Sequence, residues 1–161
     1  MTIQVGDRLP ETSFMVTTSD GPAAKTTDDI FKGKKVVLFA VPGAFTPTCH
    51  RNHLPGYVQN IDAFKAKGIE TVAVTAVNDV FVMKAWADAS GAADKITFLA
   101  DGSANFAKAI GLTLDASQNG LGIRSQRYAM IVEDGVVKAL EVEDVPSKAD
   151  VSTAENILKH L

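Results

Sequence analysis

The apolar positions of this chain fall into two kinds of segment that follow one another along the sequence. Continuous apolar or β-branched runs are typical of buried strands, and they occur at residues 36–41, 71–76 and 96–99. Apolar residues at helical spacing predict helices over residues 54–67, over 103–110, over 152–161, and in a segment that Asn78 or Asp79 can cap.

Turn residues divide the remaining segments. Residues 127–132 and 136–142 are β-rich and flank Glu133-Asp134-Gly135, which predicts a hairpin. A short apolar stretch at residues 14–16 reads as one arm of another hairpin. Residues 114–126 are polar and contain glycine, so we expect a functional loop there. The acidic run at 141–144 alternates as a solvated strand edge does.

This order of elements indicates a fold class. Strands alternate with helices, and a hairpin and a helix close the chain. The pattern predicts an α/β, thioredoxin-like fold, with a central mixed β-sheet flanked by helices. No repeat or linker divides the chain, so residues 1–161 are expected to form a single domain.

Composition narrows the classes of partner. The net charge is −3 and the pI is near 5.6, which argues against nucleic acid or an anionic membrane surface. No apolar run approaches the ~20 residues of a membrane span. Residues 1–7 lack the basic and apolar regions of a secretory signal, and one cysteine cannot form an internal disulfide. We therefore expect a soluble protein of the cytoplasm.

The single cysteine, Cys49, stands where the strand over residues 36–41 gives way to the helix that follows. Free N–H groups and the dipole at a helix N-terminus favour a thiolate. An isolated buried cysteine is usually structural, but a cysteine that only fills space does not need this position. We interpret Cys49 as a nucleophile.

Ionisation alone does not make a thiol react rapidly with an electrophile such as a peroxide. Lowering a pKa of about 8.5 by about 2.5 units raises the thiolate fraction by at most about 30-fold. Donors that stabilise charge on the peroxide oxygens must supply the rest. We expect the Thr46 hydroxyl and the N–H groups of Thr48 and Cys49 to do so. Arg127 is the expected forked cation, and Pro42 is expected to shield the thiolate.

For other residues near the cysteine or in the predicted loop, we expect structural or surface roles as well as possible contacts at the site. His50 and His53 lack the second ligand pair and the spacing of zinc motifs, so we expect no metal and no cofactor. His53 is expected to pack or to hydrogen-bond near the helix start. Arg124 is expected to be solvated or paired at the surface. Phe45 and Leu121 are candidates for the mouth of the site or for a partner contact.

Several motifs in order resemble those of peroxiredoxins. Pro42-x-x-x-Thr46-x-x-Cys49 matches the active-site signature, and the surrounding Val-Pro-Gly-Ala-Phe-Thr-Pro-Thr-Cys resembles the type II, or peroxiredoxin 5, subfamily. The likeness covers most of the chain and includes residues 53–57, 77–86, 120–122 and 127–130.

The resemblance implies a redoxin-type domain with thiol peroxidase activity toward hydrogen peroxide and small organic hydroperoxides. Cys49 would be the peroxidatic residue, and Pro42, Thr46 and Arg127 would complete the peroxide site. The resemblance also implies a homodimer, with contacts near Cys49 and at residues 76–84.

This chain departs from the subfamily in one respect. Related members often carry a second, resolving cysteine, but the matching positions here hold Val74 and Val151. A sulfenic acid on Cys49 must then be resolved by an outside thiol, which is a 1-Cys mechanism. Glutathione with glutaredoxin is the leading candidate for the reductant, and thioredoxin is the second.

Two other functions are compatible with a reactive cysteine. A redox-sensing or chaperone-like protein would use Cys49 oxidation as a switch, reacting once without turnover. A cysteine acyl-transfer enzyme would need a histidine base beside the thiol, and the three candidates are His50, His53 and His160.

Overall fold

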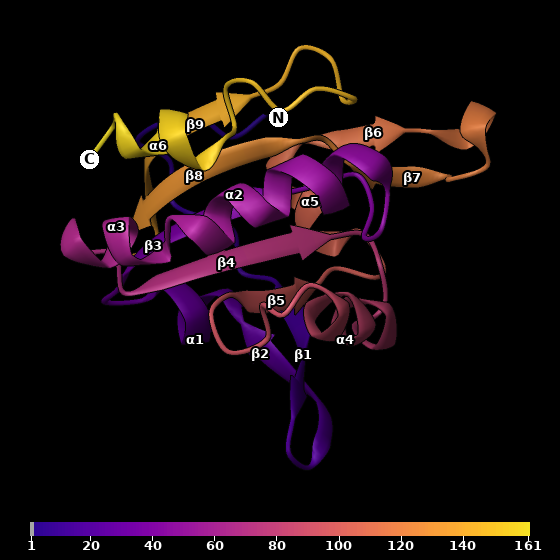
Figure 1. Ribbon diagram of the computed structural model, residues 1–161, viewed down its shortest axis with the longest axis horizontal. Coiled ribbons are helices and arrows are strands. Elements are labelled where there is room, and N and C mark those ends of the chain that lie inside the picture. Colours follow the sequence, from indigo (N-terminus) through magenta and orange to yellow (C-terminus); the bar gives the residue numbers. More distant parts are fainter. Residues whose placement is uncertain (1) are drawn as a thin grey trace.

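The structure is a computed structural model that describes residues 2–161. Within these residues, seven strands form one mixed sheet and two more form a small separate sheet (Figure 1). In spatial order the large sheet consists of β2 (Gly21–Thr26), β1 (Ser13–Thr18), β5 (Thr97–Ala100), β4 (Thr71–Ala76), β3 (Lys35–Ala40), β8 (Tyr128–Glu133) and β9 (Val136–Val142). β3 pairs in parallel with β4 and antiparallel with β8, so the sheet is mixed.

Helices cover both faces of the sheet. One face packs against α2 (Leu54–Gln59), α3 (Ile61–Ala66), α4 (Val80–Ala89) and α6 (Ala154–Leu158). The other face packs against α1 (Thr27–Phe31) and α5 (Asn105–Ile110). This three-layer arrangement confirms the expected thioredoxin-like fold class.

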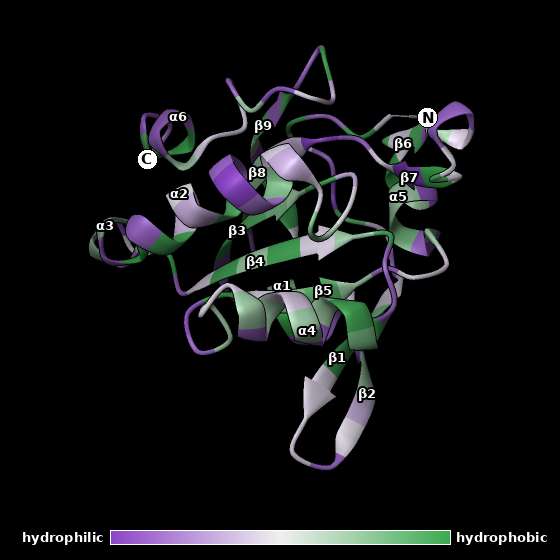
Figure 2. Ribbon diagram, turned by 45° about the vertical axis from the view of Figure 1, so that its right-hand side comes forward, coloured by the Kyte–Doolittle hydropathy of each residue, from purple (hydrophilic) through white to green (hydrophobic). Residues whose placement is uncertain are grey.

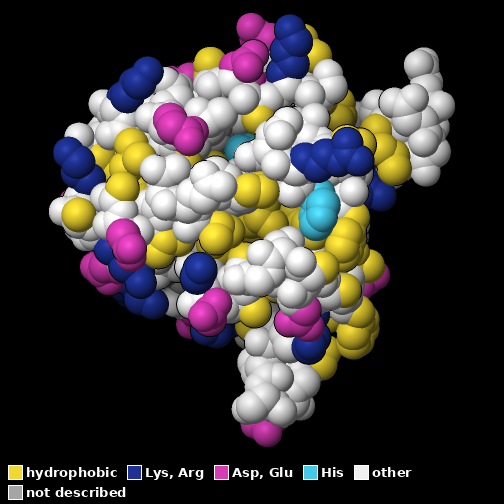
Figure 3. All heavy atoms as spheres, in the orientation of Figure 1, with side chains coloured by type: hydrophobic (Ala, Val, Ile, Leu, Met, Phe, Trp, Pro, Cys, Tyr) yellow, Lys and Arg dark blue, Asp and Glu magenta, His cyan; other side chains and the backbone are white. Residues whose placement is uncertain are grey.

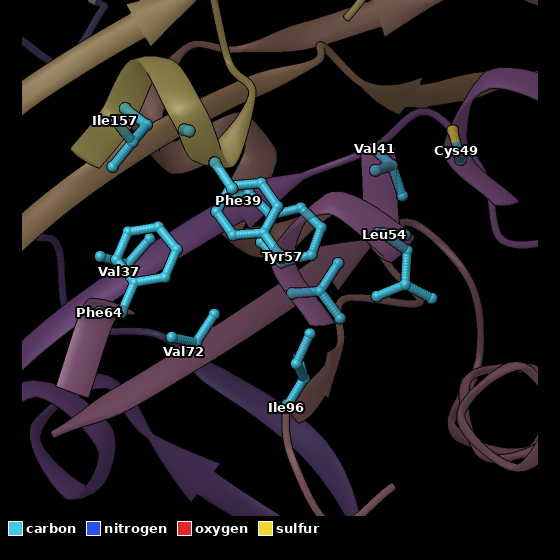
Figure 4. Close-up of a cluster of buried hydrophobic side chains, with 14 of the residues drawn as sticks. Val37, Phe39, Val41, Cys49, Leu54, Tyr57, Phe64, Val72, Ile96 and Ile157 are labelled. Carbon is cyan, nitrogen blue, oxygen red and sulfur yellow. The ribbon is translucent and has the colours of Figure 1, made fainter. Parts of the chain in front are cut away.

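The side chains of β3 show why the sequence forms this core. Val37 and Phe39 point to the layer of α2 and α3, whereas Val36 and Leu38 point to the layer of α1 and α5. A strand covered on both faces reads as a continuous apolar run, and the central strands are accordingly green in Figure 2. In the first of these clusters Phe39 stacks on Tyr57 with ring centroids 3.9 Å apart (Figure 4).

The predicted hairpins are present. β1 and β2 pair along their whole length, and β8 and β9 flank a tight turn. In that turn Asp134 and Gly135 both adopt positive φ values, 48° and 78°, which suits the right-handed twist of the flanking strands.

Three segments differ from the prediction. The helix expected over residues 54–67 is divided at Asn60 into α2 and α3, because Asn60 leaves the helical conformation (φ −105°, ψ 12°). The loop expected at 114–126 contains a small hairpin of β6 (Thr113–Asp115) and β7 (Ile123–Ser125), joined through a 3₁₀ turn, Ser117–Asn119. α1 was not predicted. It is only five residues long, and its clearest signal is a capping box between Thr26 and Asp29.

Candidate active site

Cys49 lies at one end of the core, just beyond the end of β3 (Figure 4). Helical conformation begins at residue 47, and Cys49 opens a π-helical turn, Cys49–His53, that leads into α2. The Leu54 N–H donates to the Cys49 carbonyl, which is the i→i+5 bond of a π-helix. The His50 N–H donates to the Thr46 carbonyl, so the N–H groups of Thr48 and Cys49 belong to the first turn.

The Cys49 sulfur has two hydrogen-bond partners among residues 2–161. The Thr46 hydroxyl and the Arg127 Nη2 each lie 2.9 Å from it. The thiol group has no exposed surface. Both donors can stabilise negative charge on the sulfur, because they approach it in a site that excludes bulk water.

The Thr46 hydroxyl lies between two groups that can accept its proton. It lies 2.7 Å from the Gly43 carbonyl and 2.9 Å from the sulfur of Cys49. The hydroxyl has one proton, so the two neighbours cannot both receive it at once. It can donate to a thiolate, or accept from a thiol while it donates to Gly43.

Arg127 is buried, and each of its three nitrogens has a partner. Nε donates to the Pro146 carbonyl at 2.9 Å, Nη1 lies 2.8 Å from the Nδ1 atom of His53, and Nη2 donates to the sulfur. In the described part of the chain no carboxylate forms an ion pair with this guanidinium. A buried charge requires compensation, and a Cys49 thiolate supplies it.

The imidazole ring of His53 is neutral and accepts a hydrogen bond from Arg127. An arginine only donates, so Nδ1 of His53 accepts, and the ring proton lies on Nε2. Nε2 then donates to the Ser152 carbonyl at 2.9 Å. Burial, followed by the positive charge of Arg127, lowers the pKa of His53 to about 3, although the bond to Ser152 opposes this.

This geometry argues against acyl transfer. Both ring nitrogens of His53 are engaged by groups other than the thiol, and the Nδ1 atom of His50 lies 3.0 Å from the indole Nε1 of Trp86, which donates to it. Within residues 2–161 no histidine is hydrogen-bonded to the sulfur of Cys49, so none is placed as its general base.

The remaining predicted site residues lie in the same loop and helix. Pro42 is buried two residues after the end of β3. The Thr48 hydroxyl donates to the Ser147 carbonyl at 2.8 Å, so its side chain is turned toward the C-terminal segment.

Arg124 differs from its expectation. It is partly buried and donates to the carbonyls of Leu121 and Pro42, which ties the β6–β7 hairpin to the active-site loop. A Cβ atom on Gly43 would lie 2.9 Å from Nη1 of Arg124 and 3.0 Å from Cγ2 of Thr46. The close approach of these two side chains explains the glycine.

Sequence reasoning missed one residue in this region. Glu143 was assigned to a solvated strand edge, but its side chain is buried. Its Oε2 atom accepts hydrogen bonds from the backbone of Asp150 and from the backbone and hydroxyl of Ser152. The alternating acidic run gave no sign of this, because the partners lie in a loop seven to nine residues further along the chain.

Comparisons with known proteins show which family this chain resembles. A model of the redoxin family matches residues 4–158. The chain is 42% identical to peroxiredoxin-2E, chloroplastic, of Arabidopsis thaliana over 163 residues, which cover 99% of this chain and 69% of that protein. It is 51% identical to peroxiredoxin-2F, mitochondrial, of the same plant over 130 residues, which cover 81% of this chain and 65% of that protein.

A solved structure resembles the whole fold. Reduced Prx3 from Vibrio vulnificus, solved in complex with hydrogen peroxide, superposes with a TM-score of 0.93 at 51% identity, and 98% of each chain is covered. Together with the relatives above, it shows that this chain belongs to the redoxin family and is a peroxiredoxin of the type II, or peroxiredoxin 5, kind, a thiol peroxidase.

Proposed function

We propose that this peroxiredoxin reduces hydrogen peroxide and small organic hydroperoxides by a 1-Cys mechanism, with Cys49 as its peroxidatic residue. The observation that carries the proposal is the pair of 2.9 Å hydrogen bonds from Thr46 and Arg127 to the sulfur of Cys49. The complex of the Vibrio vulnificus relative with hydrogen peroxide supports the same class of substrate.

In the first step the Cys49 thiolate attacks one oxygen of the peroxide. A sulfur–oxygen bond forms and the oxygen–oxygen bond breaks, so the sulfur loses two electrons and the peroxide gains them. The leaving hydroxide or alkoxide takes up a proton from solvent. Thr46, Arg127 and the N–H groups of the first helical turn stabilise the charge that develops on the oxygens. Pro42 is proposed to shield the thiolate on one side.

In the second step an external thiol reduces the sulfenic acid. It forms a mixed disulfide with Cys49 and releases water, and a second thiol then displaces Cys49 as a thiolate. The single cysteine of the sequence supports this route. Val74 is buried in β4 and Val151 lies in the loop before α6. Because both residues are valines, neither position supplies a resolving thiol. We propose glutathione with glutaredoxin as the reductant, and thioredoxin as the second candidate.

A homodimer and a single domain over residues 1–161 are part of the proposal. Hydrophobic side chains reach the surface across the face shown in Figure 3. Phe45 and Phe81 are large and well exposed, 47% and 70%, and they lie in or beside the segments that we propose as the dimer contact. Leu121 is also exposed.

We propose the cytoplasm as the compartment, because a reducing environment keeps Cys49 as a thiol. The relatives described above are named chloroplastic and mitochondrial. Within residues 2–161, no helix is both long and apolar enough to span a bilayer. Fractionation of the source cells, followed by detection of the protein, tests the compartment.

Peroxide consumption tests the mechanism. The reduced protein and its Cys49→Ser variant are given hydrogen peroxide with glutathione and glutaredoxin, with thioredoxin and its reductase, or with neither. We expect continuous turnover with one reductant system and none for Cys49→Ser. Oxidation of one equivalent without turnover in any system would favour the redox-sensing alternative, and turnover by Cys49→Ser would contradict the mechanism.

A further inference from the structure

The loop of residues 143–152, which joins β9 to α6, lies against the active site. Three of its carbonyl groups accept hydrogen bonds from side chains of the site. The bonds run from Arg127 Nε to Pro146 O (2.9 Å), from Thr48 Oγ1 to Ser147 O (2.8 Å) and from His53 Nε2 to Ser152 O (2.9 Å). Tyr57 adds a fourth bond, from its hydroxyl to Ser152 O at 2.6 Å.

Glu143 closes this loop on itself. Its Oε2 atom accepts from the N–H of Asp150 (2.8 Å), the N–H of Ser152 (2.8 Å) and the hydroxyl of Ser152 (2.6 Å). The side chain is 8% exposed. Three donors on one carboxylate oxygen form a strong, directional anchor, because each bond is assisted by the negative charge.

The position of the loop determines the position of Arg127. No carboxylate among residues 2–161 pairs with this guanidinium, so two of its three nitrogens depend on the loop. Nε is bound to Pro146 directly, and Nη1 is bound through His53 to Ser152. These two contacts fix the plane of the guanidinium and direct the remaining nitrogen, Nη2, at the sulfur of Cys49.

We propose that Glu143 is a positioning residue of the peroxidase reaction: by closing the 143–152 loop, it holds Arg127 in line with Cys49. This inference rests on the proposed function of Cys49. Glu143 touches neither the sulfur nor Arg127, and its effect is carried by the loop carbonyls.

A purely structural role for Glu143 makes a different prediction. In that structural role, Glu143 would hold Ser152, which precedes α6, and would thereby attach the C-terminal helix to the core. Loss of that anchor would lower the stability of the fold without a specific effect on chemistry at Cys49. Two rates measured on reduced variants that remain folded separate the roles, because a purely structural role leaves both rates at the values of the matched control.

The experiment compares Glu143→Ala and Glu143→Gln with Glu141→Ala and Glu141→Gln. Glu141 is a matched control two residues earlier, in β9, and its side chain lies 3.1 Å from His160 in an exposed pair. The first rate is that of oxidation by hydrogen peroxide, followed by the fluorescence of Trp86, whose indole is bonded to His50 beside Cys49. The second is alkylation of Cys49 by iodoacetamide, followed by mass spectrometry. Thermal unfolding of each variant is recorded in parallel.

We expect Glu143→Ala to slow oxidation by peroxide about tenfold or more relative to Glu141→Ala, since a misplaced catalytic group costs up to about 100-fold. Alkylation of Cys49 should also change in the same variant, because the loop no longer holds Arg127 against the sulfur. Glu143→Gln should recover part of the oxidation rate, since an amide oxygen still accepts hydrogen bonds. If Glu143→Ala does not fold, the comparison of Glu143→Gln with Glu141→Gln decides, with a drop of about threefold or more expected.

The inference is overturned if the oxidation and alkylation rates of the folded Glu143 variants match those of their Glu141 counterparts. The proposed function fails separately, if the unaltered protein does not react with peroxide at Cys49.

Discussion

We propose that the chemistry of Cys49 depends on Arg127 more than on any other residue. It is 2% exposed and has no carboxylate partner within residues 2–161, and its three nitrogens reach three different groups in one plane. A positive charge buried in this way is stabilised by a thiolate more than by a thiol. It is also available to the peroxide oxygens as charge moves from the sulfur onto them.

Substituting Arg127 by lysine should separate charge from geometry. Lysine keeps the charge but cannot donate to Pro146, His53 and Cys49 at once, because its donors lie on a single nitrogen. We expect the rate constant for oxidation by hydrogen peroxide to fall about 100-fold. Stopped-flow fluorescence measures it, with Arg8→Lys, a surface arginine remote from the site, as the control. A rate equal to that of the control would show that charge alone suffices.

Thr46 should act through its hydroxyl rather than through its shape. Thr46→Val preserves the volume and removes the donor that lies 2.9 Å from the sulfur, whereas Thr46→Ser retains the donor. We expect a loss of about 100-fold in the peroxide rate constant for valine and of only a few-fold for serine. Equal losses in the two variants would assign the effect to packing of the methyl group instead.

The burial of His53 predicts a dependence of stability on pH. Its pKa is lowered to about 3 in the folded protein, while the ordinary value is 6.5. Between these values the unfolded chain binds a proton that the folded chain does not, so the contribution of His53 to stability is complete above pH 6.5 and is lost as the pH falls toward 3.

We therefore expect the free energy of unfolding of the unaltered protein to fall below pH 6.5 more steeply than that of His53→Gln, by about 1.4 kcal/mol per pH unit at the steepest. Urea denaturation at a series of pH values measures the slopes, and His160→Gln is the surface control. Parallel curves for the unaltered protein and His53→Gln would mean that the histidine is protonated in the fold.

At the scale of elements, the active-site loop combines two departures from regular structure. Phe45 has a positive φ of 65°, which is costly for a bulky residue, and the helix that follows contains a π turn at Cys49–His53. The π turn adds one residue to the helix and alters the direction of the side chains around it. Both features lie within four residues of the sulfur, where strain in proteins is commonly retained for function.

The β8–β9 turn provides a test of the pairing between β9 and β8, the strand that begins directly after Arg127. Gly135 has φ +78°, and a Cβ atom there would meet Nη1 of Arg8 at 3.0 Å. We expect Gly135→Ala to lower the free energy of unfolding by about 1–2 kcal/mol. Gly56→Ala is the contrast, since this helical glycine has no neighbour within 4 Å of the added atom, and the substitution should stabilise by about 0.5–1 kcal/mol. Denaturant titration of both variants measures the changes, and a neutral or stabilising Gly135→Ala would contradict the assigned turn.

Elements whose signal is local could be predicted from the sequence. The strand β4 matches residues 71–76, and the turn between β8 and β9 follows from Asp134-Gly135. The break at Asn60 and the five-residue α1 were not predicted, because apolar spacing continues through the first and the second is too short for a periodic pattern.

In the candidate site, too, contacts between residues close in the sequence could be predicted, whereas contacts that depend on a loop's conformation could not. Thr46 and Cys49 are three residues apart, and their contact follows from the start of one helix. Arg127 was placed in the site by its hairpin and by the motif around it. The burial of Glu143 could not be read from the sequence, because it depends on how the 143–152 loop folds back on the strand.

At the scale of the whole molecule, the two-sided core places the reactive sulfur. β3 is covered by helices on both faces and ends directly before the active-site loop, while β8, its antiparallel neighbour, begins directly after Arg127. Ala40 and Tyr128 form the last residue pair between β3 and β8 at this end of the sheet. The sheet therefore brings together two residues that are 78 positions apart in the sequence.

The role of Cys49 is tested most directly by the rate at which the reduced protein reacts with one equivalent of hydrogen peroxide in the absence of any other thiol. We predict that one equivalent is consumed per chain, that Cys49 is recovered as a sulfenic acid, and that the rate constant exceeds that of a free thiol by several orders of magnitude. Cys49→Ser should consume none. A rate constant equal to that of free cysteine, or oxidation without involvement of Cys49, would contradict the central claim that Thr46 and Arg127 make Cys49 a peroxidatic residue.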